Sequence, residues 1–133
     1  MWLLKTEPSE FGYPDLERAG RSVWDGVRNP VALKNLQAMK AGDRAFVYHT
    51  GAEKAAVGIA GVTRAAYPDP KSRNAKLVVV DLEPVERLAR PVTLAEIKAM
   101  AVFADSPLVR QGRLSVVPLT AAQWKAIESR GRG

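Results

Sequence analysis

Short apolar segments, each ended within a few residues by proline or glycine, limit most strongly what this chain can fold into. The most apolar and β-branched of them runs from Lys76 to Leu82, which is typical of a central strand. Pro84 is expected to interrupt its continuation at Val85, because proline has no N–H for a sheet ladder. The same pattern predicts strands at residues 2–5, 45–49, 56–62 and 114–117.

The predicted helices are also short. One spans Pro14 to Ala19 and ends at Gly20, and capping signals mark three more: Asn29 before Pro30, Thr93 with Glu96, and Thr120 with Gln123. Strands and helices do not alternate regularly. We therefore predict an α+β protein, a small mixed β-barrel of about five or six strands flanked by short helices. Its 133 residues suit one domain spanning residues 1–133.

Two glycines lie inside the strand predicted at residues 56–62. Gly58 and Gly61 indicate a bulge, a bend, or a backbone that another group approaches closely. A structural role is the preferred interpretation, because a small barrel needs sharp corners.

Composition narrows the function. The chain has no Cys and one His, so we expect neither a metal site nor thiol catalysis, and no cofactor. No apolar run approaches the roughly 20 residues of a membrane span, and the N-terminus is unlike a signal peptide. A cytoplasmic protein without a membrane partner is therefore expected. The net charge of +6 favours a polyanion such as nucleic acid, although many basic proteins never bind one.

Three segments in the first half combine aromatic and hydrogen-bonding residues near predicted strand ends or turns. They are Lys5-Thr6-Glu7-Pro8, Trp24-Asp25-Gly26-Val27-Arg28-Asn29-Pro30 and Tyr48-His49-Thr50. Such segments supply faces for stacking and groups that read the edge of a flat polar ligand.

Each candidate residue also has a structural interpretation. Trp24 can stack on a base or belong to the core, and Glu7 can accept from an exocyclic amino group or make a turn contact. Asn29 can read a base edge or cap the helix that begins at Pro30. Tyr48 and His49 alternate along a strand, so they should face opposite sides unless a bulge intervenes.

The remaining candidates are contacts of simpler kinds. His49 can act as a general base, a ligand contact or a satisfied core residue. Ser115 can offer a hydroxyl to a ligand, or can be an ordinary strand residue. Arg28 and Arg113 can bind phosphate, and a surface ion pair is the common alternative for an isolated arginine.

Several of these segments, taken in order, resemble the EVE domain. Besides Trp2-Leu3-Leu4-Lys5-Thr6-Glu7-Pro8 and Trp24-Asp25-Gly26-Val27-Arg28-Asn29, the likeness includes Met39-Lys40-Ala41-Gly42-Asp43, Tyr48-His49, Gly58-Ile59-Ala60, Ala66-Tyr67-Pro68-Asp69 and Arg113-Leu114-Ser115-Val116. The resemblance implies a PUA-like β-barrel, related to the YTH and ASCH domains. It also implies a non-catalytic pocket for a modified base, with modified cytosine in DNA as the ligand usually associated with EVE domains. Thr6 and Thr50 stand where the family often has Ser, and both keep a hydroxyl.

The sequence thus predicts a module that takes a modified base of DNA or RNA out of its stack and holds it without catalysis. The pocket residues are expected to be Thr6, Glu7, Trp24, Asn29, Tyr48, His49 and Ser115, with Arg28 and Arg113 on phosphate. Two alternatives stay open. One is a small enzyme acting on a nucleotide or modified base through His49 and Glu7, and the other is a regulatory module for a free small molecule.

Overall fold

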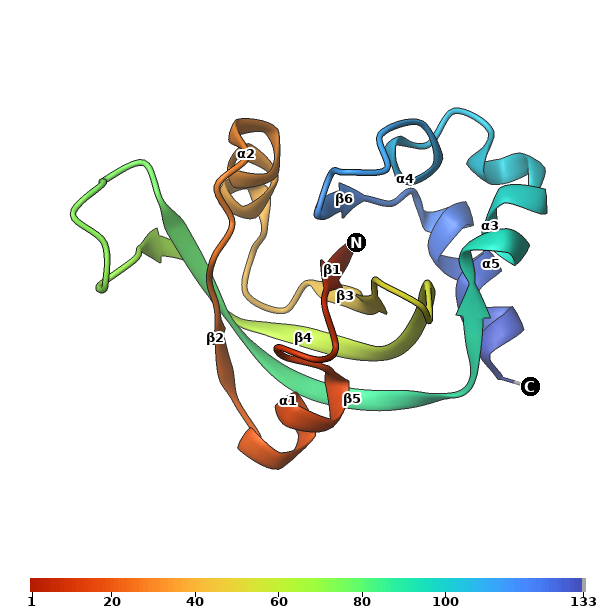
Figure 1. The fold of residues 1–133 in the computed structure, drawn as a ribbon, viewed down its shortest axis with the longest axis horizontal. Helices are drawn as coiled ribbons and strands as arrows, with labels where there is room; N and C mark the ends of the chain where they lie inside the picture. The colour runs from red at the N-terminus through yellow and green to blue at the C-terminus, as the bar shows by residue number, and fades with distance from the viewer. Residues whose placement is uncertain (133) are drawn as a thin grey trace.

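The computed structural model describes residues 1–132, which share one six-stranded curled sheet in the order β2-β5-β4-β3-β1-β6 (Figure 1). Among the strands of residues 1–132, only β1 and β3 pair in parallel, and the other neighbours are antiparallel. Within the described residues, the edge strands β2 and β6 do not pair, so the sheet forms a half-barrel. The predicted α+β, PUA-like class is confirmed. The strands are β1 (Trp2–Thr6), β2 (Ser22–Trp24), β3 (Arg44–His49), β4 (Ala55–Pro68), β5 (Val78–Thr93) and β6 (Val116–Pro118).

Short helices begin at the predicted caps. Asn29 Oδ1 accepts from the N–H groups of Val31 and Ala32, and Thr93 and Thr120 form the predicted capping boxes. The C-terminal helices gather at the far end of β5, whereas α2 follows β2 and contacts β4, β5 and β6 (Figure 1). None of the helices described in residues 1–132 is long and apolar enough to cross a membrane. The helical elements are α1 (Tyr13–Ala19), α2 (Pro30–Ala38), α3 (Leu94–Ala99), the 3-10 turn η1 (Ala101–Phe103), α4 (Pro107–Arg110) and α5 (Ala121–Gly131).

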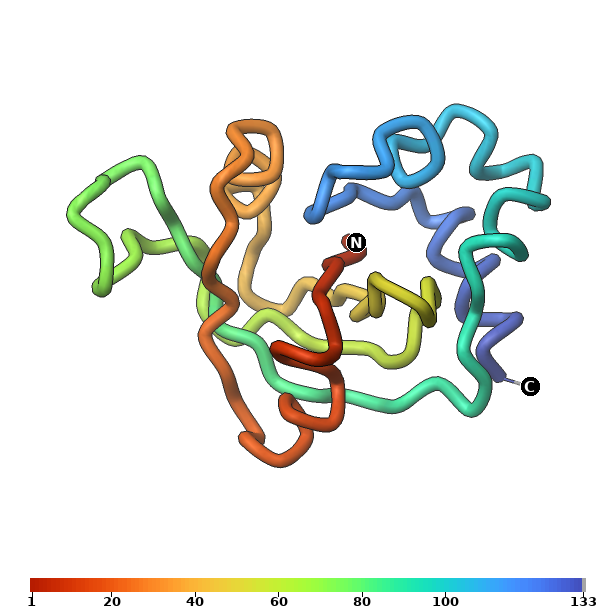
Figure 2. Tube along the Cα trace, in the orientation of Figure 1, coloured from red at the N-terminus to blue at the C-terminus, as the bar shows by residue number. Residues whose placement is uncertain are grey.

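The long hairpin of β4 and β5 corrects one prediction. Pro84 does not interrupt the strand, because β5 continues through Pro84 and Val85 to Thr93. Pro84 lies opposite Ala60, next to a register shift, so its missing N–H falls where the ladder is already irregular. The loop of this hairpin stands away from the rest of the chain (Figure 2). The short elements β2 and α4 were not predicted.

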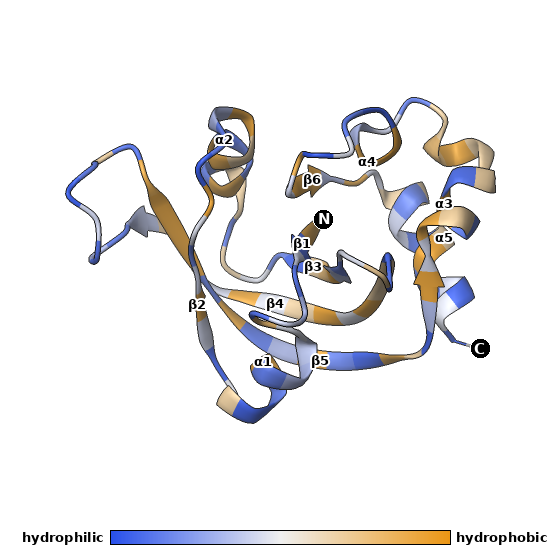
Figure 3. Ribbon diagram, in the orientation of Figure 1, coloured by the Kyte–Doolittle hydropathy of each residue, from blue (hydrophilic) through white to orange (hydrophobic). Residues whose placement is uncertain are grey.

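The core lies against the concave sheet, and apolar residues are concentrated along β4 and the first half of β5 (Figure 3). Phe46 and Trp124 stack inside it with ring centroids 3.9 Å apart. The ring of Tyr13 lies directly on Gly58, where an added Cβ would be 2.4 Å from Tyr13 Cε1. Gly58 therefore serves a close approach beside a bulge, one of the roles that its position predicted.

Candidate functional site

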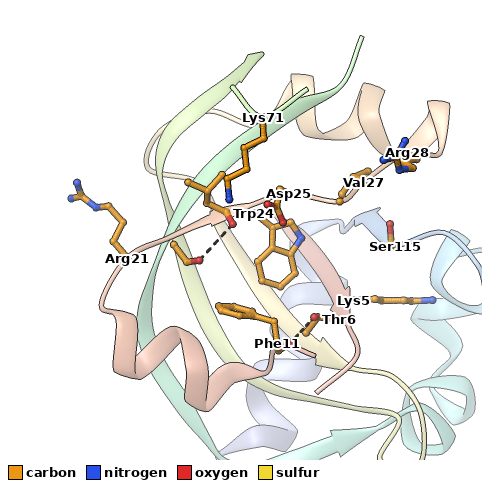
Figure 4. Close-up of a pocket in the computed structure, with 13 residues that line it drawn as sticks. Lys5, Thr6, Phe11, Arg21, Trp24, Asp25, Val27, Arg28, Lys71 and Ser115 are labelled. Atoms are coloured by element: carbon orange, nitrogen blue, oxygen red, sulfur yellow. Dashed lines mark hydrogen bonds between the residues drawn. The ribbon is translucent and has the colours of Figure 1, made fainter. Parts of the chain in front are cut away.

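The opening between the two edge strands contains a cavity of about 610 Å³ (Figure 4). β2 and the segment that follows it form one wall, and the end of β1 with the segment before β6 forms the other. The cavity therefore exists because the half-barrel stays open. Its lining residues are Lys5, Thr6, Phe11, Arg21, Ser22, Val23, Trp24, Asp25, Gly26, Val27, Arg28, Lys71 and Ser115.

Two aromatic rings form the apolar wall. Trp24 is only 7% exposed and meets Phe11 edge to face, with centroids 6.0 Å apart and planes at 81°. Trp24 is thus a core residue, as one interpretation of it predicted, and it also lines the cavity. Phe11 was missed, because nothing in its local sequence distinguishes it from a core aromatic residue. Its backbone is held by Thr6, whose hydroxyl donates to the Phe11 carbonyl at 2.6 Å.

Polar groups of β1 and the segment before β6 complete the opposite wall. Lys5 is half-buried, and Lys5 Nζ donates to the Gly112 carbonyl at 2.9 Å. Burial lowers the pKa of Lys5 below its ordinary value of 10.5. The backbone N–H of Lys5 donates to the Ser115 carbonyl, and within residues 1–132 the Ser115 hydroxyl has no hydrogen-bond partner. That hydroxyl is available to a ligand in the cavity.

The cavity is rich in positive charge. Lys5, Arg21, Arg28 and Lys71 line it, against the single carboxylate of Asp25. Within the described residues none of these five groups forms an ion pair. Lys71 reaches down from the loop between β4 and β5 toward the mouth of the cavity (Figure 4). This arrangement suits a flat ligand that carries negative charge outside the aromatic wall.

The structure brings together only part of the predicted site. Thr6, Trp24, Arg28 and Ser115 line the cavity, whereas the other candidates do not. The prediction missed several charged residues that line the cavity, among them Arg21, Asp25 and Lys71. Of these, Arg21 and Lys71 lie outside the predicted motifs. Arg21 and Lys71 carried no local signal, because isolated basic residues occur throughout the chain.

Two candidates outside the cavity have structural partners. Asn29 caps α2, as one interpretation of it predicted. Glu7 Oε1 accepts from the backbone N–H and the hydroxyl of Ser9, at 3.2 and 3.1 Å. Arg113 is exposed and does not line the cavity.

Tyr48 and His49 lie in different surroundings, as the alternation of a strand predicts. His49 is buried, and its Nε2 accepts from the Tyr13 N–H at 3.0 Å. The ring proton therefore lies on Nδ1, which donates to Glu53 Oε1 at 2.7 Å. Both ring nitrogens are occupied by these structural contacts.

Tyr48 lines a second, smaller cavity of about 180 Å³ on the other side of Lys5. Lys5 Nζ lies 5.7 Å from the centre of the Tyr48 ring and lines both cavities. Burial raises the pKa of Tyr48. Lys54 and Lys98 also line the second cavity, so it is basic but has a largely apolar floor.

The sequence of the chain matches one protein family and is similar to that of a human protein. The family model described as "EVE domain" matches residues 1–130. Human thymocyte nuclear protein 1 is 30% identical, and the alignment covers 96% of this chain and 72% of that protein.

Solved structures agree closely with the fold. A Rhodopseudomonas palustris protein determined by NMR is 44% identical, with a TM-score of 0.91 over 98% of this chain and 91% of that one. Human THYN1, solved in complex with DNA containing 5-methylcytosine, is 30% identical, with a TM-score of 0.90 over 99% of this chain and 97% of that one. An ASCH protein from Zymomonas mobilis shares the fold at 14% identity, with a TM-score of 0.61 over 96% of this chain and 93% of that one.

Proposed function

The chain belongs to the EVE domain family, and from this premise we propose that its cavity binds a modified base within nucleic acid. The observation that carries the proposal is the cavity at the open edge of the half-barrel, with an aromatic wall, free polar groups and a basic mouth. Its volume falls in the range of about 300–1,000 Å³ typical of small-ligand sites. The THYN1 complex makes 5-methylcytosine in DNA the first candidate ligand.

The binding energy in this proposal comes mainly from stacking. Extruding a base costs a few kcal/mol, and a base–aromatic stack contributes about 1–3 kcal/mol. Trp24 and Phe11 supply the apolar wall for that stack. The added methyl group of a modified pyrimidine gains from the same apolar wall, so its burial favours the modified base.

Edge recognition in this proposal uses the polar groups of the cavity. Asp25 lines the cavity and can accept from an exocyclic amino group such as cytosine N4. This is the role that the sequence suggested for Glu7, whose carboxylate instead contacts Ser9. The hydroxyl of Ser115 offers a further donor or acceptor, while Arg28 and Arg113 are proposed to contact phosphate.

The proposed role is binding without catalysis. The enzyme alternative relied on His49 and Glu7, and His49 holds its two ring nitrogens in contacts with Tyr13 and Glu53. A group already engaged in this way is poorly placed to take a proton from a ligand. The cytoplasmic location remains a prediction from the sequence.

A direct test compares the affinities of Trp24→Ala for matched oligonucleotides with and without one 5-methylcytosine. We expect the substitution to weaken binding of the modified strand by about 1–3 kcal/mol, roughly fivefold to more than a hundredfold. Because Trp24 is buried, the variant must be measured at a temperature where circular dichroism shows it folded.

Trp124→Phe is the matched control, since Trp124 stacks on Phe46 in the core and does not line the cavity. It should lose stability but keep the affinity of the wild type. A folded Trp24→Ala that binds normally would refute the assignment of the pocket. An RNA strand of the same sequence and free 5-methylcytidine serve as competitors, and superior competition by either changes the ligand class.

A further inference from the structure

Two further hollows adjoin the cavity between the edge strands, which we call the base cavity, on the side of the β4–β5 loop. The nearer, of about 460 Å³, is lined by the segment after β2 and by Lys71 and Arg73 of the loop. The farther, of about 370 Å³, is lined by Lys34 of α2 and by Lys76. Arg28 lines all three spaces, which therefore adjoin one another. We call the two outer hollows, lined by Arg28, Lys34, Lys71, Arg73 and Lys76, the hairpin groove.

The cations of the hairpin groove differ from most other arginines of the described residues in their lack of ion pairs. Within residues 1–132 none of its five cations forms an ion pair. Six arginines elsewhere each pair with a carboxylate: Arg18, Arg87, Arg90, Arg110, Arg130 and Arg132. Asp69, which also lines the groove, instead accepts from the Lys71 backbone N–H at 2.9 Å. The groove therefore presents an excess of positive charge to solvent, five cations against the carboxylates of Asp25 and Asp69.

The loop that carries three of these cations is internally braced. The Asp69 N–H donates to the Leu77 carbonyl at 3.0 Å and closes the loop. Inside it, the Asn74 N–H donates to Ser72 Oγ at 3.1 Å, and Asn74 Oδ1 accepts from the Lys76 N–H at 3.0 Å. These hydrogen bonds brace the loop backbone that carries the cations, so binding need not order that backbone.

We propose that the hairpin groove binds the phosphodiester backbone of the strand on one side of the extruded base. The inference rests on the proposed function, because the base cavity sets where the strand begins. The ligand is a series of phosphates that each carry one negative charge. Such a series fits a row of separate cations better than one compact anion would. The opposite exit, past Lys5 to Lys54 and Lys98, is a hollow of about 180 Å³ with a largely apolar floor.

The first test measures salt dependence with a fluorescent single strand that carries one 5-methylcytosine. The groove variant is Lys71→Gln, Arg73→Gln, Lys76→Gln. The control variant, Lys54→Gln, Lys98→Gln, Lys125→Gln, removes the same charge elsewhere on exposed positions. The slope of log K against log salt is negative, and each lost phosphate contact reduces its magnitude by about 0.7 for single strands. The magnitude should therefore fall by about 2 in the groove variant. The control should keep nearly the wild-type slope.

The second test measures strand direction. Oligonucleotides carry the modified base at the 5′ end or at the 3′ end, with flanks of increasing length on the other side. The wild-type protein should gain affinity with flank length for one polarity only, and the groove variant should lose that gain. Equal gains in affinity for both polarities would refute the proposal that the hairpin groove binds the strand. Equal salt slopes in the groove variant and the control variant would also refute it.

The preference for modified over unmodified base judges the proposed function separately. The groove variant should retain that preference, because its changes leave the aromatic wall intact. A wild-type protein that binds modified and unmodified strands equally well would refute the proposed binding of a modified base in the cavity. This holds even if the salt slope still assigned the phosphodiester backbone to the groove.

Discussion

The base cavity and the cluster around His49 both combine aromatic residues with polar side chains. They differ in whether those polar groups form hydrogen bonds within the protein. In the His49 cluster, formed by His49, Tyr13, Glu53 and Gly58, the ring nitrogens of His49 bond to Tyr13 and Glu53, and Tyr13 Oη donates to the Ile59 carbonyl at 2.8 Å. In the base cavity, the Ser115 hydroxyl and the Asp25 carboxylate have no partner within the described residues.

This difference separates structural polar groups from binding groups. A buried polar group must be satisfied by the protein, so full use of its hydrogen bonds indicates a role in stability. Unused donors and acceptors beside an aromatic wall at an open edge indicate a role in binding. Residue type alone did not make this distinction, because the sequence suggested His49 and Trp24 for the same pocket.

The largest expected effect lies in the His49 cluster. Gly58→Ala would place a methyl group 2.4 Å from the Tyr13 ring, which is only 1% exposed. We expect a loss of about 3 kcal/mol in the free energy of unfolding, measured by urea denaturation. Gly112→Ala is the control, since no atom lies within 4 Å of its added Cβ, and it should change stability by less than about 0.5 kcal/mol. Equal stability of the two variants would contradict the packing described.

A second change removes the hydrogen bonds of the cluster. His49→Ala leaves the Tyr13 N–H buried without an acceptor, so we expect a loss of about 2 kcal/mol of stability. Oligonucleotide affinity should stay unchanged at a temperature where the variant is folded. Glu53→Gln keeps an acceptor for His49 Nδ1 and should cost much less. A stable His49→Ala protein with impaired binding would move His49 from the structural cluster to the site.

A smaller effect is expected at acid pH, from a carboxylate whose hydrogen bonds are also satisfied within the protein. A hydrogen bond from Arg90 holds the pKa of Glu96 at about 2, below its ordinary value of 4.5. Because the folded-state pKa is lowered, this contribution is complete above about pH 4.5 and is lost as pH falls through about 2. Glu96→Gln should therefore flatten the decline of melting temperature between pH 5 and 2. A variant with an unchanged acid profile would show that other carboxylates dominate.

The smallest stability effect is expected in the base cavity. Ser115→Ala removes a hydroxyl that has no partner in residues 1–132, so stability should change by less than about 0.5 kcal/mol. If the hydroxyl contacts the base, affinity should fall by about 0.5–1.5 kcal/mol, roughly two- to tenfold. Ser129→Ala, on the exposed side of α5, should change neither quantity. Unaltered affinity in the Ser115 variant would remove that residue from the site.

Much of the fold could be predicted because its signals are local. Asn29, Thr93 and Thr120 cap helices through contacts with groups two or three residues away, which a short window of sequence contains. The Pro84 prediction was wrong for the opposite reason. The bulge that accommodates this proline depends on its pairing with Ala60 in another strand.

The candidate site was predicted less completely than the fold. The sequence pointed to Trp24, Arg28 and Ser115, but it could not show that Trp24 is both buried and part of a cavity wall. Phe11 and Lys71 line the same cavity from other parts of the chain. Their membership depends on the path of the chain between them, which no local pattern contains.

By itself the sequence determined the mixed fold class, the starts of the three helices capped by Asn29, Thr93 and Thr120, the family resemblance and the basic character, because each depends on local residue pattern or total charge. Only the tertiary structure decided that β2 and β6 remain apart, and therefore where the cavity opens. It also decided that the side chain of His49 would meet the backbone of Tyr13, while Lys71 would reach the cavity containing Trp24. These decisions belong to long-range packing, which satisfies one set of polar groups and leaves the other facing solvent.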